Sequence, residues 1–110
     1  MKIALYTNEF PPNIYGGAGV HIDFLSQELA KLGQVEVRCF GDQKENKDSM
    51  HVEGINSCLT KMVDPENEHI KMFHNLSRNV EMAQATPKAD IVHCHTWYTH
   101  LAGVFTRELL

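Results

Sequence analysis

The sequence predicts an α/β fold built on a doubly wound, mainly parallel sheet. Three observations support this prediction. Short apolar runs alternate with helical patterns along the chain. The first run, Ile3-Ala4-Leu5-Tyr6, is apolar without interruption, which is typical of a strand covered on both faces. A glycine-rich loop then joins this strand to the first helical pattern, as in β-α-β units.

The first forty residues predict one β-α-β unit. Lys2 to Thr7 is the first strand, and Asn8 to Gly17 is a loop marked by Pro11-Pro12 and Gly16-Gly17. Ala18 to Leu32 is a helix, and Val35 to Phe40 is a second strand. The helix carries its apolar residues at a spacing of 4-3-4-3, which places them on one face: Ala18, Ile22, Leu25, Leu29 and Leu32. Gly33 stands where such a helix usually ends.

The remaining residues predict further elements of the same kind. Gly41 to Ser49 is polar and charged, and we expect a solvated excursion. The pattern of residues 51–63 is ambiguous, with a candidate short strand near Val52 to Ile55. Asp64-Pro65-Glu66 has the residues of a helix start, which predicts a helix to about Gln84. Its inward residues would be Phe73, Leu76, Val80 and Ala83. Ala89 to Cys94 is the next strand, His95 to His100 a turn, and a last helix carries Leu101, Val104, Phe105 and Leu109.

Length and charge limit the classes of protein to consider. The chain has 110 residues, of which 43 % are hydrophobic and 22 % charged, which is an ordinary globular composition. Ten basic and 14 acidic residues give a net charge of −4, which argues against a nucleic-acid-binding surface. Three or four strands make about half of a doubly wound sheet, so we expect the N-terminal part of a longer protein.

The cysteines and the N-terminus bear on the compartment. No signal-peptide pattern and no run of about 18 apolar residues is present, which predicts no membrane span. Cys39, Cys58 and Cys94 include no C-x-x-C pair, which favours reduced thiols and a cytoplasmic location. We expect Cys39 and Cys94 to be small buried hydrophobic residues in strands.

The glycine loop, Ile14 to Val20, is the first candidate site. Glycines let a ligand approach the backbone, and a helix N-terminus offers free N–H groups and about half a positive charge to a phosphate. The spacing matches neither G-x-G-x-x-G nor G-x-x-x-x-G-K-[ST]. His21, in the first turn of the helix, could face the same anion. The alternative is a glycine-rich turn of purely structural use.

The second candidate site is His93-Cys94-His95-Thr96-Trp97-Tyr98. His93 and His95 lie two apart and so share one face of a strand, whereas Cys94 points to the other. A metal site is disfavoured because no acidic ligand is near and the thiol points away from the histidines. We therefore expect polar hydrogen bonding at the mouth of a cleft, with Trp97 beside a sugar or base. Histidines without a direct ligand role are the alternative.

Both motifs resemble one enzyme family. Glu9-Phe10-Pro11-Pro12 with Tyr15 to His21, and Asp90 to Tyr98 with Leu101-Ala102-Gly103, closely resemble bacterial and archaeal glycogen (starch) synthases of the family 4 type. The resemblance implies a GT-B glycosyltransferase, in which two Rossmann-like domains face a cleft. Residues 1–110 would then be the incomplete, acceptor-side N-terminal domain.

The resemblance also implies an activity and residue roles. The family transfers glucose from ADP-glucose or UDP-glucose to an α-1,4-glucan with retention of configuration, without a bound metal or cofactor. Gly16 and Gly17 would approach the donor phosphates, and His95, Thr96 and Trp97 would line the sugar end of the cleft. The family's C-terminal donor residues lie beyond Leu110, so we expect no catalytic residue within this chain and no activity of the chain alone.

Two departures from related synthases leave the donor and product open. Ile14 stands where the other main type of bacterial synthase has the lysine of a Lys-x-Gly-Gly motif, and Thr96 stands where that type has an acid. One alternative is another family 4 glycosyltransferase. The other is a non-catalytic α/β module that binds a phosphorylated ligand.

Overall fold

A five-stranded sheet with helices on both faces forms the structure, a computed structural model that describes residues 1–58 and 64–109. The elements, in chain order, are β1 (Lys2–Thr7), α1 (Gly17–Ala30), β2 (Gln34–Phe40), β3 (Lys44–Lys47), β4 (Met50–Ile55), α2 (Ile70–Ala85), β5 (Ile91–His95), the 3-10 helix η1 (Trp97–Thr99) and α3 (His100–Leu109). The strand order is β3-β4-β2-β1-β5, and every pairing is parallel except β3 with β4. The predicted α/β fold with a parallel-dominated sheet is confirmed.

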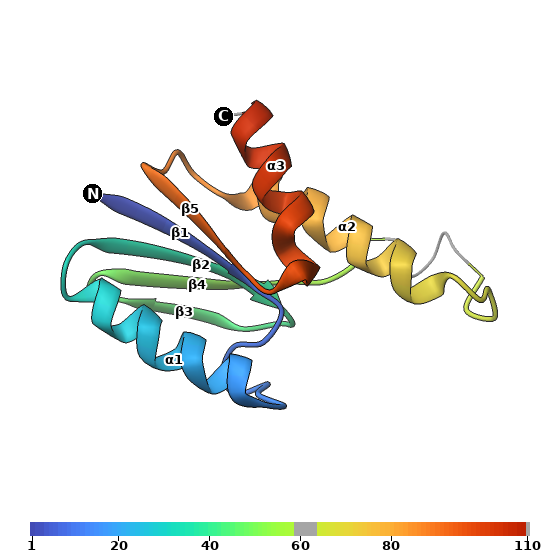
Figure 1. The fold of residues 1–110 in the computed structure, drawn as a ribbon, viewed down its shortest axis with the longest axis horizontal. Coiled ribbons are helices and arrows are strands. Elements are labelled where there is room, and N and C mark those ends of the chain that lie inside the picture. The colour runs from blue at the N-terminus through green and yellow to red at the C-terminus, as the bar shows by residue number, and fades with distance from the viewer. Residues whose placement is uncertain (59–63, 110) are drawn as a thin grey trace.

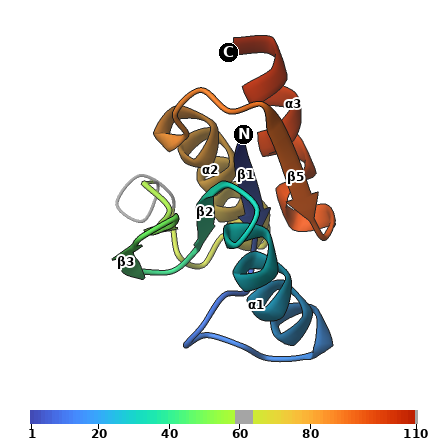
Figure 2. The same ribbon diagram turned by 90° about the vertical axis from the view of Figure 1, so that its left-hand side faces the viewer.

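The two faces of the sheet are covered by different helices. α1 lies on one face, and α2 and α3 lie on the other (Figures 1 and 2). β1 supplies both cores, because successive side chains of a strand point to opposite faces. Ile3 and Leu5 pack in one cluster with Ile22 of α1, whereas Ala4 and Tyr6 pack in the other, with Met82 and Ala102. This double burial explains the uninterrupted apolar run.

The carboxyl ends of the central strands meet at one edge of the sheet. Thr7, the last residue of β1, pairs in register with Cys39 of β2 on one side and His95 of β5 on the other. α1 and α3 both begin at this edge (Figure 1). The residues that follow β1 and β5 are therefore brought together, as the sequence predicts for a parallel sheet.

The predicted helix Ala18 to Leu32 forms with shifted bounds. Ile22 is buried, and Leu25 and Leu29 pack against the core, as expected. Leu32, however, is 82 % exposed, so its assignment to the inward stripe was wrong. The helix ends at Ala30, and the N–H groups of both Leu32 and Gly33 donate to the Leu29 carbonyl oxygen, which turns the chain away from the helix axis.

The segment Gly41 to Ser49 contains a strand that the sequence analysis did not predict. Lys44–Lys47 forms β3, whose four residues are all exposed. The expectation of a solvated segment is confirmed for these residues but wrong for Gln43, which is buried and donates a hydrogen bond to the Phe10 carbonyl oxygen at 2.9 Å. The strand pairs antiparallel with β4, from Lys44 opposite Glu53 to Lys47 opposite Met50. Backbone pairing at the sheet edge forms this strand without any apolar side chain. β4 itself, Met50–Ile55, is longer than the predicted Val52 to Ile55. The rest of the ambiguous segment, residues 59–63, lies outside the described residues.

The predicted helix start at Asp64 was wrong, because α2 begins at Ile70. Asp64 instead accepts a hydrogen bond from the Glu66 N–H at its side-chain oxygen, 3.0 Å, and Asn67 accepts one from the His69 N–H in the same way, 2.8 Å. These are turns in which the short polar side chain bonds the backbone two residues on. The same residue types favour both helix caps and such turns.

The buried face of α2 also differs from the prediction. Ala83 is buried and Phe73 is half-buried, but Leu76 and Val80 are exposed. Asn79 is fully buried instead: its amide nitrogen donates to the Tyr98 carbonyl oxygen at 2.8 Å, and its side-chain oxygen accepts from the Ala102 N–H at 2.7 Å. α2 therefore packs on α3 through a satisfied polar side chain, which an apolar-stripe prediction cannot find.

β2 carries a buried ion pair. Arg38 is only 2 % exposed and lies 3.4 Å from the Glu36 carboxylate, which is buried beside it. The guanidinium also donates to the carbonyl oxygen of Ala85 at 2.9 and 3.1 Å. This ties the last residue of α2 to the sheet, and it satisfies a carbonyl group that no further helical turn would bond.

The cysteines are free thiols in three environments. Cys39 is fully buried in β2, and burial raises the pKa of its thiol to about 12. Cys94 is half-buried against α3, where a Cβ added to Gly103 would lie 2.4 Å from its sulfur. Both packing predictions hold, more fully for Cys39. Cys58 is exposed. In the described part of the chain, no helix has the length and apolar character needed to cross a membrane.

Candidate functional site

The three glycines at the start of α1 have two different environments. Gly16 is the N-cap of α1 and Gly17 its first residue, and a Cβ added to either would meet no atom within 4 Å. No side chain caps the N-terminus of this helix. Gly19 is buried, and a Cβ there would lie 2.9 Å from the Ile14 side chain and 3.1 Å from Cβ of Glu9. Gly19 is therefore needed for packing, whereas Gly16 and Gly17 leave the first-turn amides open to a ligand.

Glu9 shapes this loop. Its side chain is buried, and its carboxylate accepts a hydrogen bond from the Tyr15 N–H at 2.6 Å. The Thr7 hydroxyl donates to the Glu9 carbonyl oxygen at 2.7 Å, which fixes the chain as it leaves β1. A buried carboxylate bonded to backbone sets the position of the residue just before the glycine pair. In the sequence, Glu9 stands out only as part of the resemblance motif, and this role was not predicted.

The chain after β5 contains a strained residue. Thr96 has φ 77° and ψ 155°, a conformation that is open to glycine and costly for a β-branched residue. Its hydroxyl donates to the Asn8 side-chain oxygen at 2.9 Å, so the residues just past β1 and β5 are bonded to one another. Strain of this kind persists only where the surroundings hold it. It falls on one of the predicted site residues.

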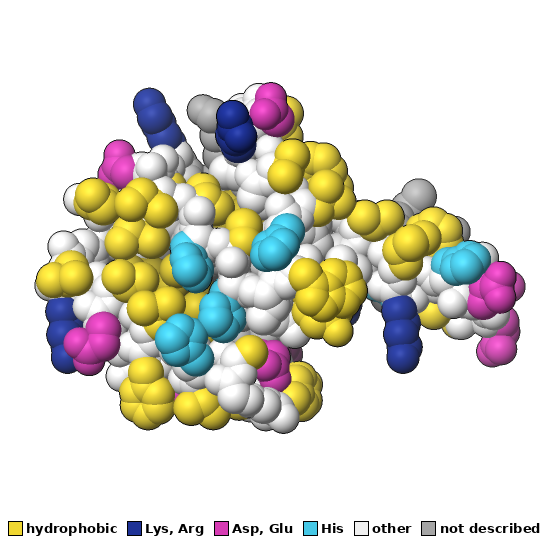
Figure 3. Space-filling model, in the orientation of Figure 1, with side chains coloured by type: hydrophobic (Ala, Val, Ile, Leu, Met, Phe, Trp, Pro, Cys, Tyr) yellow, Lys and Arg dark blue, Asp and Glu magenta, His cyan; other side chains and the backbone are white. Residues whose placement is uncertain are grey.

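Three histidines gather at this edge. The ring of His95 stacks on that of His21 from α1, with centroids 5.2 Å apart, and on that of His93, at 6.1 Å. Figure 3 shows histidine side chains close together near the middle of the visible face. Because Cys94 packs on the opposite side of β5, it is not part of this group. Among residues 1–58 and 64–109, no three His, Cys, Asp or Glu side chains are arranged to hold a metal ion.

His95 links the histidine group to the glycine loop. Its imidazole lies near the backbone of Ala18, the residue after Gly17, which acts on its pKa, and its Nε2 is buried without a partner in the described structure. Burial lowers the pKa of His95, and the neighbouring His21 and His93 lower it further, although the backbone of Ala18 and the charge of Glu9 act the other way. The imidazole is therefore held neutral beside the open amides of α1.

Trp97 lies at the outer end of the predicted site. It is 66 % exposed, and its ring stacks on that of Tyr98 with centroids 4.0 Å apart. An exposed indole backed by a second aromatic ring can pack against an apolar sugar face. The structure thus brings Gly16, Gly17 and His95 together through Ala18, and places Thr96 and Trp97 on the segment that follows.

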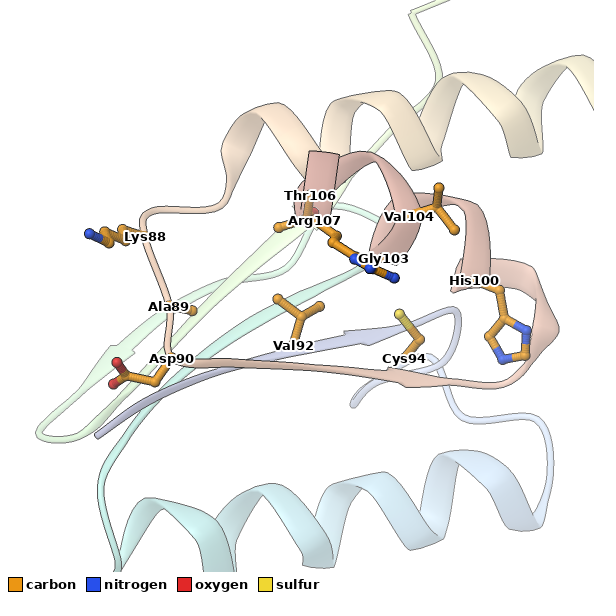
Figure 4. Close-up of a pocket in the computed structure, with 10 residues that line it drawn as sticks. All are labelled: Lys88, Ala89, Asp90, Val92, Cys94, His100, Gly103, Val104, Thr106 and Arg107. Atoms are coloured by element: carbon orange, nitrogen blue, oxygen red, sulfur yellow. The ribbon is translucent and has the colours of Figure 1, made fainter. Parts of the chain in front are cut away.

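Another groove lies away from these residues. It has a volume of about 520 Å³ and runs between β5 and α3, from Lys88 and Asp90 at one end to His100 at the other (Figure 4). Val92 and Cys94 form its floor, and Arg107 reaches over them from α3 (Figure 4). None of the five predicted site residues lines it. Among described strands β5 pairs only with β1, so this groove borders the open edge of the sheet.

Comparison with known proteins identifies the family. The sequence pattern of Glycosyltransferase Family 4 matches residues 15–108, which is most of the chain. The chain belongs to glycosyltransferase family 4. The match begins at Tyr15, just before the open glycine pair, and includes the β5 motif. Membership confirms the predicted family 4 type and agrees with the α/β fold.

This family 4 chain is also similar in sequence to individual named proteins. It is 37 % identical over 107 residues to an alpha-maltose-1-phosphate synthase of Mycolicibacterium smegmatis, and 36 % identical over 104 residues to one of Mycobacterium tuberculosis. Each alignment covers 94 % of this chain and 24 % of the relative. An uncharacterized glycosyltransferase of Methanocaldococcus jannaschii, MJ1607, is 34 % identical over 119 residues, covering 99 % of this chain and 28 % of that protein. The family 4 chain therefore spans about a quarter of the length of these relatives.

Proposed function

We propose that this chain is the incomplete, acceptor-side N-terminal domain of a GT-B enzyme that transfers glucose from a nucleotide-sugar donor. The observation that carries the proposal is the open amide edge at Gly16 and Gly17, next to the neutral imidazole of His95. Family 4 membership supplies the reaction class. An edge of free N–H groups at a helix start suits the diphosphate of a nucleotide sugar.

The chemistry expected of this edge is charge stabilisation. Transfer breaks the bond between C1 of glucose and the diphosphate oxygen, and the diphosphate leaves with the electron pair. The first-turn N–H groups of α1 and the positive end of its dipole would stabilise that charge as it develops. A neutral His95 can add a hydrogen bond without the charge-charge repulsion of three protonated histidines. No residue of this chain is proposed as a general acid or base.

The acceptor has two candidates. The first is α-D-glucose 1-phosphate, because relatives that are 36–37 % identical are named alpha-maltose-1-phosphate synthases, and adding one glucosyl unit to this acceptor gives maltose 1-phosphate. The second is an α-1,4-glucan, which the motif resemblance to glycogen synthases favours. In either case we propose that Thr96 and Trp97 contact the sugar and that the donor is ADP-glucose or UDP-glucose.

A matrix of substrates tests the proposal. The full-length protein is incubated with ADP-glucose or UDP-glucose, each with glucose 1-phosphate or glycogen, and products are identified by NMR and by labelled glucose incorporation. We expect maltose 1-phosphate from one donor. Incorporation into glycogen alone would select the second acceptor. Release of the nucleoside diphosphate in none of the four mixtures would contradict the glucosyltransferase proposal and favour a non-catalytic ligand-binding module.

A further inference from the structure

A further groove lies at the carboxyl edge of the sheet, on the α2 side. It consists of two cavities of about 270 and 240 Å³ that share Asn8, Phe40 and Arg78 in their walls. Asn8 follows β1 and Phe40 ends β2, so the groove opens where ligands of parallel α/β sheets bind. Asn8 also bonds the hydroxyl of Thr96, which places the groove next to the proposed sugar end of the site.

One face of α2 lines this groove with basic and polar side chains. Lys71, His74, Asn75 and Arg78 are spaced 3-1-3 along the helix, which puts all four on one face, and all four line the larger cavity. Among the described residues, no acidic side chain lines either cavity. This is unusual in a chain with a net charge of −4. The charge of the groove is therefore complementary to an anion.

Arg78 is one of the cations that have no counter-ion among residues 1–58 and 64–109. Its guanidinium lies over the ring of Phe40, 5.0 Å from the centroid, and within residues 1–58 and 64–109 it has no hydrogen-bond acceptor or carboxylate partner. Its Nε is buried and unpaired, and so is the side-chain oxygen of Asn75. Burial lowers the pKa of Arg78, which records the cost of keeping the charge away from water. Stacking uses the face of the guanidinium and leaves the in-plane N–H donors free.

Arg38 provides the comparison within the same chain. It is fully buried, whereas Arg78 is partly exposed with only its Nε buried, and Arg38 has Glu36 beside it and the Ala85 carbonyl oxygen on its donors. A buried charge is normally paired in this manner. Arg78 lacks such a partner and instead faces a cavity of about the size of a sugar phosphate. Planar guanidinium donors match the oxygens of a phosphoryl group, which they can bind in bidentate fashion.

We propose that this groove binds the phosphoryl group of a phosphorylated sugar acceptor, with Arg78 as its main ligand and Lys71 as a second cation. The proposal rests on the glucosyl transfer proposed above and chooses between its two acceptors, since an uncharged glucan needs no cationic groove. The phosphoryl group on Arg78 places the sugar toward Asn8 and Thr96. The donor diphosphate occupies the separate amide edge at Gly16 and Gly17.

Direct binding to the full-length protein tests this assignment. Calorimetry is performed with α-D-glucose 1-phosphate, with glucose, and with ADP or UDP, on the wild type, Arg78→Gln, Lys71→Gln and Arg107→Gln. Arg107 is a control cation of α3 in the β5–α3 groove. We expect Arg78→Gln to weaken glucose 1-phosphate binding at least tenfold and Lys71→Gln to weaken it severalfold. Nucleotide binding by these two variants, and all binding by Arg107→Gln, stay at the wild-type level.

Several results would overturn the assignment. Unchanged glucose 1-phosphate affinity in Arg78→Gln removes Arg78 as the ligand, and an equal loss of nucleotide affinity assigns the groove to the donor. If Arg78→Gln does not fold, as judged by circular dichroism, Lys71→Gln on the exposed part of the same face and Arg78→Lys decide instead. Wild-type affinity in both of these would also overturn it.

Kinetics separate this inference from the proposed function. In an active enzyme, Arg78→Gln raises the KM for glucose 1-phosphate while kcat and the donor KM change little, because the contact is the same in the ground and transition states. Binding of glucose 1-phosphate through Arg78 without any transfer would leave the anion site standing and contradict the transferase. Transfer to glycogen without glucose 1-phosphate binding would support the transferase and contradict the anion site.

Discussion

The imidazole rings of His21 and His95 lie stacked with their centroids 5.2 Å apart and their planes 23° from parallel. One ring comes from the first turns of α1 and the other from the end of β5. Two protonated rings at this separation would repel each other, and His93 adds a third. The contact between the glycine loop and the β5 motif therefore depends on the protonation of His95.

The pH dependence of stability follows from His95. Its pKa in the folded protein is below 6.5, chiefly through burial, so the unfolded chain binds more protons than the folded one between the two pKa values. This contribution to the free energy of unfolding is fully present above pH 6.5 and is lost as pH falls through the folded pKa. We expect the stability difference between wild type and His95→Asn, measured by urea unfolding of the full-length protein, to shrink over that range. A difference that grows with acidity would contradict the lowered pKa.

The glycines at the start of α1 serve two different purposes, which are access for a ligand and close packing. In the full-length enzyme we expect Gly17→Val to lower kcat about 10² to 10³-fold, because its side chain would keep the diphosphate away from the first-turn N–H groups, an effect comparable to losing one donor to a developing charge. Its free energy of unfolding should stay within about 0.5 kcal/mol, because a Cβ there meets no atom. Gly19→Ala is the matched change at a packed position, and it should destabilise by about 1–3 kcal/mol. Undiminished turnover of Gly17→Val would place the diphosphate elsewhere.

The backbone of Thr96 gives a prediction about two small substitutions. Ala and Gly both remove the hydroxyl that bonds Asn8, but only Gly also relieves the positive φ. We expect Thr96→Gly to be more stable than Thr96→Ala by about 1 kcal/mol, the reverse of the usual order. Chemical denaturation of the two variants measures this difference. An Ala variant of equal or greater stability would show that the strain is absent.

A buried and an exposed ion pair of the chain should differ sharply in their effect on the free energy of unfolding. Arg38→Met leaves Glu36 buried without its guanidinium and should lower the free energy of unfolding by about 3–5 kcal/mol. Lys31→Met breaks an exposed pair with Glu28, 2.9 Å apart, and should change it by less than about 0.5 kcal/mol. Urea unfolding of both variants provides the comparison. Similar losses would mean that burial of Arg38 is not what makes its pair important.

Much of the fold could be predicted from local patterns. The run Ile3 to Tyr6 indicates a strand buried on both faces, and the loop glycines indicate the start of α1. Both features could be predicted because each depends on residues that are close in the sequence. β3 could not be predicted, since Lys44–Lys47 becomes a strand through the backbone of β4. The start of α2 was misplaced because Asp64 has the same local preference for a turn and for a helix cap.

Part of the candidate site could likewise be predicted from the sequence, and part could not. Gly16, Gly17 and His95 follow from motifs at predicted strand ends, and the structure joins them through Ala18. The missing counter-ion of Arg78 depends on what folds around it, so its charge alone carried no signal. The spacing of Lys71, His74 and Arg78 on one helix face was present in the sequence and could have drawn attention to that face.

The two outer strands of the sheet are chemically unlike. β3 presents Lys-Glu-Asn-Lys, all exposed, and charged side chains of this kind discourage the addition of another chain. β5 has a bare hydrogen-bonding edge beside Ile91 and Val92, and the groove under α3 runs along it. A strand that joins this sheet, from the same polypeptide or from another, is therefore expected to pair with β5 and not with β3.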